Sequence, residues 1–187
     1  MNDFLPQGYE PPKTQWNYMR IVDWDNKFRI MSNATVGWLD WETLEDWTRK
    51  PIRFRYSKKP ETSFDLEKPV KHFWAFIVYN YTDKSIQVLE ITQKSIQSAI
   101  NSLYLNEDWG DPKQYDIKIN RSWKDLKTEY VVTPSPTKPI SPDIVKEFES
   151  KNINLEALFE WKDPFDSTNK KTNKYNEEEL NIEDVPF

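Results

Sequence analysis

Alternation of apolar and polar residues runs through much of the chain and predicts a sheet. In residues 26–31, Phe28 and Ile30 fall on one face while Lys27 and Arg29 fall on the other, which is the period of a half-buried strand. Residues 70–81 are the strongest strand, because they are dense in aromatic and β-branched side chains. Further strands are predicted over residues 35–41, 51–56, 85–91, 115–121 and 128–133, and a short helical turn over residues 44–47.

The period changes to that of a helix between two of these strands. Ile96, Ala99, Ile100 and Leu103 follow i, i+3, i+4, i+7 spacing and predict a helix over residues 93–105. Ser141 before a proline is typical of a helix start, so a second helix is expected to residue 150, and a short one over residues 155–159. This order predicts a mainly β protein: a five-stranded oligonucleotide-binding (OB) barrel with a helix between strands 3 and 4, an extra strand, and short C-terminal helices.

The chain is expected to divide into three parts: a Pro-rich arm (1–20), the OB domain with its C-terminal helices (21–165) and a disordered acidic tail (166–187). The formal net charge is −5, but the last thirteen residues hold five acids and no base, so the rest balances 26 bases against 26 acids. Residues 49–71 carry eight bases and three acids. Local potential rather than net charge steers a polyanion, so this segment is a candidate phosphate contact or, alternatively, a solvated loop.

Composition argues against several kinds of site. There is no Cys, one His and three Gly, which leaves no thiolate nucleophile, no His-rich metal site and no glycine-rich phosphate loop. Asp108, Asp111 and Asp116 are interpreted as turn residues, although a two-metal nuclease stays open. We therefore expect no enzyme, no catalytic residue, no metal and no cofactor. No apolar run reaches membrane length, so a cytoplasmic protein without a membrane partner is predicted.

Aromatic residues make up 15% of the chain and include nine Trp, and such rings stack on the bases of single strands. Along residues 70–81, His72, Trp74 and Phe76 share one face, while Phe73, Ala75 and Ile77 share the other. Small Ala75 and branched Ile77 suit a barrel interior, so the first face is predicted to bind; the reversed register stays open, with Tyr79 and Tyr81 as stacking residues. The other DNA-binding candidates are Trp38 on the strand before the basic segment, Trp123 as a cap on the groove, and Arg53, Arg55, Lys71, Lys118 and Arg121 for phosphates.

The chain end, Glu183-Asp184-Val185-Pro186-Phe187, is similar to the acidic tip, Asp-Asp-x-Pro-Phe, of bacterial single-stranded DNA-binding proteins. The body resembles bacteriophage single-stranded DNA-binding proteins, above all across residues 71–81 and 88–96. The resemblance implies a protein that coats single-stranded DNA in phage DNA replication, recombination and repair, in the host cytoplasm. It implies that Glu183, Asp184, Val185, Pro186 and Phe187 bind replication or recombination partners, with the terminal ring in an apolar pocket and the carboxylate on a cation.

Two other interpretations stay open beside this one. An acidic interaction module could occupy another protein's DNA site as a DNA mimic, and the nuclease has already been named. The sequence also leaves monomer and dimer open.

Overall fold

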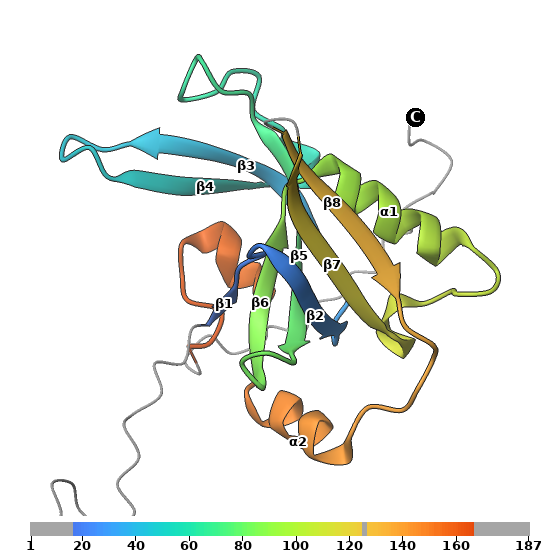
Figure 1. The fold of residues 1–187 in the computed structure, drawn as a ribbon. Helices are drawn as coiled ribbons and strands as arrows, with labels where there is room; N and C mark the ends of the chain where they lie inside the picture. Colours follow the sequence, from blue (N-terminus) through green and yellow to red (C-terminus); the bar gives the residue numbers. More distant parts are fainter. Residues whose placement is uncertain (1–16, 125–126, 167–187) are drawn as a thin grey trace, which may run out of the picture.

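The computed structural model describes residues 17–124 and 127–166 and shows a mainly β protein (Figure 1). Its strands are β1 (Tyr18–Met19), β2 (Trp24–Ile30), β3 (Thr35–Thr43), β4 (Arg49–Arg55), β5 (Lys71–Asn80), β6 (Ser85–Ile91), β7 (Asp116–Lys124) and β8 (Lys127–Pro134). The helices are α1 (Lys94–Leu105) and α2 (Pro142–Ser150), and three short 3-10 helices are η1 (Tyr56–Lys58), η2 (Pro112–Gln114) and η3 (Leu155–Glu160). The predicted arm, apart from its last few residues, and almost all of the predicted tail lie outside the described residues.

The eight strands form one mixed sheet with the order β1-β6-β5-β2-β7-β8. β1 pairs with β6 in parallel, and the other pairs are antiparallel. β3 continues the chain beyond β2 and pairs with both β5 and β4, and the β3–β4 hairpin projects from the body at the left of Figure 1. Within the described residues the sheet path ends at β1 and β8, and these two strands do not pair with each other.

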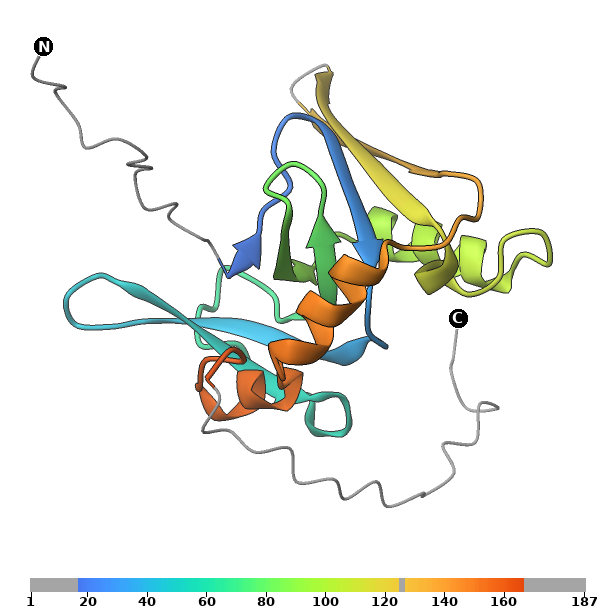
Figure 2. The same ribbon diagram turned by 90° about the horizontal axis from the view of Figure 1, so that it is seen from below.

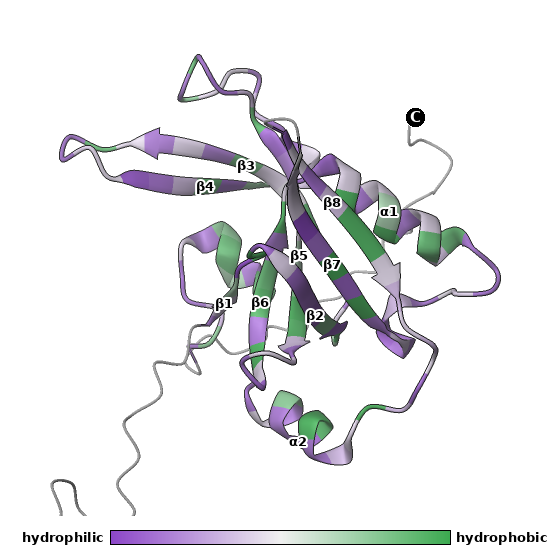
Figure 3. Ribbon diagram, in the orientation of Figure 1, coloured by the Kyte–Doolittle hydropathy of each residue, from purple (hydrophilic) through white to green (hydrophobic). Residues whose placement is uncertain are grey.

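β5 lies between two hydrophobic cores. Phe76 and Val78 point into the first core, together with Phe28 of β2, Ile117 of β7 and Ile96 of α1. Hydropathy alternates along β7 in Figure 3, as expected of a strand with one face in this core. The amphipathic helix α1 closes the first core with residues from its apolar stripe.

The second core lies on the opposite face of β5. Phe73, Ala75 and Ile77 belong there to one buried cluster with Leu155 and Leu158 of η3. Ile144 and Phe148 of α2 pack against the same cluster. Figure 2, seen from below, shows α2 and η3 on this side of the sheet. Phe73, Ala75 and Ile77 are therefore buried, as the sequence predicted, although the C-terminal helices cover them. The prediction that the whole opposite face of β5 is open is wrong, because Phe76 on that face is buried in the first core.

A buried ion pair connects β2 with β7. Arg29 and Asp116 are 2% and 0% exposed, and the Arg29 guanidinium approaches the Asp116 carboxylate to 2.7 Å. The Tyr81 hydroxyl donates to the same carboxylate at 2.8 Å, and burial together with this hydrogen bond raises the pKa of Tyr81 to about 12. Asp116 was predicted as a turn residue; it is instead the first residue of β7, where a buried carboxylate requires such partners.

The predicted strands and helices are found within a few residues of their expected ends. Residues 44–47 differ: they form the turn of the β3–β4 hairpin rather than a helical turn. The Leu44 amide donates to the Thr48 carbonyl at 2.9 Å, and Trp47 adopts a positive φ of 65°. Pairing of Thr43 with Arg49 fixes this turn, which local sequence preference did not reveal.

Candidate nucleic-acid interface

Five rings from three segments form a continuous row, which we call the aromatic row: Tyr56, Trp38, His72, Trp74 and Phe76. Trp38 and Tyr56 stack at a centroid distance of 5.9 Å with their planes 12° apart. The next centroid distances are 5.2 Å from Trp38 to His72, 6.5 Å from His72 to Trp74 and 6.1 Å from Trp74 to Phe76. The row follows from the sheet register, because Trp38 of β3 lies opposite His72 of β5 and residues two apart on β5 share a face.

Exposure falls along the aromatic row from one end to the other. Tyr56 is 52% exposed, Trp38, His72 and Trp74 are half-buried, and Phe76 is 5% exposed. We predicted Phe76 on an open binding face; it is instead a residue of the first core, since α1 covers this part of β5. Four rings, from Tyr56 to Trp74, thus remain accessible to a ligand.

His72 presents a neutral ring at the centre of the row. Burial lowers the pKa of His72 below its usual value, so the imidazole is uncharged at neutral pH. Gln97 of α1 donates its side-chain amide to the carbonyl oxygens of Ile91, at 2.9 Å, and His72, at 3.2 Å. This fixes the start of α1 against β5 and β6 and so positions the His72 backbone.

Two lysines accompany the row. The Lys59 ammonium lies 4.5 Å from the centroid of the Trp38 ring, a cation–π distance. Lys113 of the segment after α1 lies at the other end, where it lines a hollow together with Trp74 and Phe76. A flexible lysine near a stacking ring can reach the phosphate of a base that lies on that ring.

Arg53, Arg55 and Lys71 do not accompany the row. Arg53 pairs with Glu90 at 2.6 Å, and Arg55 pairs with Glu156 of η3 and lies 4.9 Å from the Phe159 ring. These contacts place both arginines on the second-core side of the sheet. Lys71 is exposed and alternates with His72 along β5, so it also points away from the rings.

Lys118, Arg121 and Trp123 lie on β7, which β2 separates from β5 in the sheet. Lys118 pairs with Asp25 at 3.3 Å, and Arg121 pairs with Asp23 at 3.4 Å. Trp123 is 64% exposed, with the Arg121 guanidinium 5.9 Å from its ring. The predicted site residues are therefore distributed over three surfaces. Of the ten, Trp38, His72, Trp74 and Phe76 form one contiguous group, and Arg121 and Trp123 form a separate pair on β7.

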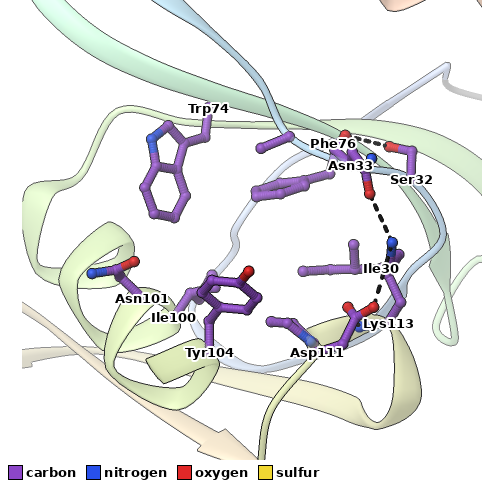
Figure 4. Close-up of a pocket in the computed structure, with 12 residues that line it drawn as sticks. Ile30, Ser32, Asn33, Trp74, Phe76, Ile100, Asn101, Tyr104, Asp111 and Lys113 are labelled. Carbon is purple, nitrogen blue, oxygen red and sulfur yellow. Dashed lines mark hydrogen bonds and ion pairs between the residues drawn. The ribbon is translucent and has the colours of Figure 1, made fainter. Parts of the chain in front are cut away.

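The hollow at the end of the row has a volume of about 380 Å³. β5 contributes Trp74 and Phe76, and α1 contributes Ile100, Asn101 and Tyr104 (Figure 4). The bend after β2, with Asn33, and the segment Asp111–Lys113 close the remaining sides. Tyr104 is 58% exposed, and Figure 4 shows its ring across the hollow from Trp74.

Sequence reasoning missed Tyr56, Lys59 and Tyr104. Alternation was a usable signal for Tyr56, because it falls two residues after Phe54 and opposite in phase to Arg53 and Arg55. Helical spacing was the signal for Tyr104, which follows Ile100 by four residues and thus lies beside the apolar stripe of α1. Lys59 had no such signal, since its approach to Trp38 depends on the path of the loop after β4.

Comparison with family models, with curated proteins and with solved structures finds no match for this chain. Among the described residues, no helix is long and apolar enough to span a membrane, and no three His, Cys, Asp or Glu side chains gather as a metal site would require. The predicted partner-binding residues Glu183, Asp184, Val185, Pro186 and Phe187 lie outside the described residues.

Proposed function

We propose that this protein binds single-stranded DNA, without strong sequence preference, along the aromatic row. The observation that carries the proposal is the row itself: four accessible rings in continuous contact on one face of a sheet, with a lysine at 4.5 Å from one of them. Every base has a π face, so rings of this kind stack on any sequence. A double helix hides its base faces, and therefore the row favours a single strand.

The strand order supports an OB-type arrangement for this function. β2 and β3 together act as a long first strand, β5 and β6 as the second and third, and β7 and β8 as the fourth and fifth, with α1 between β6 and β7. We infer an OB barrel from this order, with the β3–β4 hairpin as an addition. OB proteins bind oligonucleotides on the face of strands 2 and 3. Three rings of the aromatic row lie on β5, which is strand 2 of the OB barrel in this assignment.

A phosphate contact is assigned to Lys59 rather than to the basic strand β4. The arginines of β4 already pair with Glu90 and Glu156 on the other face, so phosphates would have to replace these partners. Few phosphate contacts imply a modest salt dependence, because each contact contributes roughly one unit to the slope of log K against log salt. Stacking on the rings then supplies the larger share of the affinity.

The proposal extends to partner recruitment in DNA replication, recombination and repair. The sequence contains a run of acids followed by Val185-Pro186-Phe187, a segment whose aromatic ring suits an apolar pocket and whose carboxylates suit a neighbouring cation. Recruitment through this tip and coating through the row would be separate activities of one chain, which the protein would perform in the host cytoplasm.

Titration of the full chain with oligo-dT at several salt concentrations, in Mg²⁺, tests the proposed function. We expect saturable binding with quenching of Trp fluorescence and no cleavage of the strand. Double-stranded DNA of the same length is the control and should bind much more weakly. Absence of oligo-dT binding at low salt would refute the proposal and favour the acidic mimic, whereas cleavage would favour the nuclease.

A further inference from the structure

The hollow beside Trp74 has a wall that is mostly apolar. Trp74, Phe76 and Tyr104 contribute rings, and Ile30 and Ile100 contribute aliphatic side chains. Trp74 and Phe76 are also the last two rings of the aromatic row. A strand that follows the row from Tyr56 therefore arrives at the mouth of the hollow.

Charge at the hollow is compensated. The Lys113 ammonium lies 3.4 Å from the Asp111 carboxylate and donates to the Asn33 side-chain oxygen at 2.7 Å. A phosphate inside would meet the Asp111 carboxylate, so the lining selects a neutral occupant. An apolar wall with a few polar groups is the usual form of a site for a small flat ligand.

We infer, on the basis of the proposed function, that this hollow holds one nucleobase of the bound strand. The base turns out of the row and stacks on Tyr104 of α1, while the sugar and phosphate stay at the open side. Asn101 of α1 is exposed at the rim, and its side chain makes no hydrogen bond to the described residues. Its amide offers both donors and an acceptor, which suits the polar edge of any base and so preserves weak sequence preference.

The position of Tyr104 supports its role as the stacking ring. The side chain is 58% exposed at the end of an amphipathic helix, although the apolar stripe beside it is buried. An exposed aromatic ring that faces a half-buried Trp across an open volume (Figure 4) leaves both rings available to one planar ligand. Base–aromatic stacking contributes about 1–3 kcal/mol per base, which corresponds to about 5-fold to 150-fold in affinity.

Abasic scanning tests this inference. The shortest oligo-dT that keeps full affinity is used, because a strand of this length cannot shift its register on the protein. Variants of it, each with one abasic position, are titrated with the wild type and with Tyr104→Ala. We expect Tyr104→Ala to weaken binding of the intact strand about 5-fold to 150-fold. At one position, removal of the base should weaken binding to the wild type but should not weaken binding to Tyr104→Ala further, because the Tyr104 ring and that base interact as a pair. At the other positions, removal of the base should lower the affinity of both proteins equally.

Two control variants separate stacking from damage to α1. Tyr104→Phe keeps the ring and should bind and scan like the wild type. Leu105→Ala alters the neighbouring residue, which is 68% exposed and outside the hollow, and should also behave like the wild type. Thermal melting of all three variants should agree with that of the wild type.

The outcomes distinguish this inference from the proposed function. If Tyr104→Ala binds oligo-dT as tightly as the wild type and loses affinity at the same abasic positions, the hollow holds no base. The proposed binding of single-stranded DNA along the aromatic row is then unaffected. A wild type that binds no strand overturns both. If Tyr104→Ala leaves DNA affinity intact but changes the sedimentation coefficient, the hollow is a contact between protein chains and the inference is wrong.

Discussion

The two faces of β5 carry similar residues but differ in what packs over them. On the second-core face, Phe73 and Ile77 are buried in one cluster with Leu155 and Leu158 of η3, and α2 packs against the same cluster. Gly37 of β3 permits this closeness, because a Cβ at that position would lie 2.8 Å from the Phe73 ring and 2.9 Å from the Phe159 ring. On the other face, His72 and Trp74 stay half-buried and Tyr56 is 52% exposed.

The basic residues show the same contrast between these two faces of the sheet. Arg53 and Arg55 are directed to the covered face, where Glu90 and Glu156 pair with them. Lys59 is directed to the ring of Trp38. An aromatic or basic residue therefore stabilises the fold on one face and is available to a ligand on the other, so position rather than residue type separates the two roles.

The largest expected effect is on the covered face. Phe73→Ala removes a fully buried ring and should lower the free energy of unfolding by about 3–5 kcal/mol. Urea unfolding measures the loss, and Phe73→Leu, which fills more of the cavity, should lose less. DNA affinity per folded molecule should not change. Weaker DNA binding with unchanged stability would mean that DNA binds on the Phe73 face of β5 and not on the aromatic row.

Trp38→Ala should have its effect on DNA binding. Loss of a stacking ring should weaken oligo-dT binding by about 1–3 kcal/mol, with a smaller loss of stability because the Trp38 indole also donates to the Tyr56 carbonyl at 2.9 Å. Trp47→Ala is the matched control, since Trp47 is 86% exposed in the turn of the β3–β4 hairpin and outside the row. Equal losses of affinity in the two variants would mean that the row is not the binding surface.

Lysine and arginine substitutions should separate the two faces by salt dependence. Lys59→Ala should flatten the slope of log K against log salt by about one unit, as expected for one lost phosphate contact. Arg55→Ala should leave the slope unchanged, because its guanidinium pairs with Glu156 on the covered face. Titrations of both variants at four or more salt concentrations measure the slopes. The reverse result would return the phosphate track to β4.

The smallest effect concerns His72, the only histidine of the sequence. Burial lowers the pKa of His72 in the folded state, so protonation favours the unfolded state. Its contribution to stability is complete above the unfolded pKa, about 6.5, and is lost as the pH falls through the lower folded pKa. NMR titration of the imidazole should give a pKa below 6.5, and His72→Gln should remove this part of the acid destabilisation. A pKa at or above 6.5 would show that the ring is not buried as described.

Much of the fold could be predicted from local pattern. The alternation along residues 26–31 and 70–81 and the helical spacing from Ile96 to Leu103 correspond to β2, β5 and α1. The grouping of His72 with Trp74 on one face also followed from the sequence, because side chains two apart in a strand share a face. These features depend on residues close together in the chain, and steric and hydrophobic preferences act at that range.

Only the tertiary structure decided which part of β5 stays accessible and which basic side chains lie beside it. A strand pattern says which side chains share a face, but it does not say what covers that face. The covering residues of η3 lie about eighty positions beyond β5, and Glu156 meets Arg55 from there. Phe76 became core because α1 packs over it, and Tyr56 joined Trp38 because β4 pairs with β3. Each of these outcomes rests on contacts between segments far apart in sequence, where hydrophobic burial and charge pairing act only once the chain has folded.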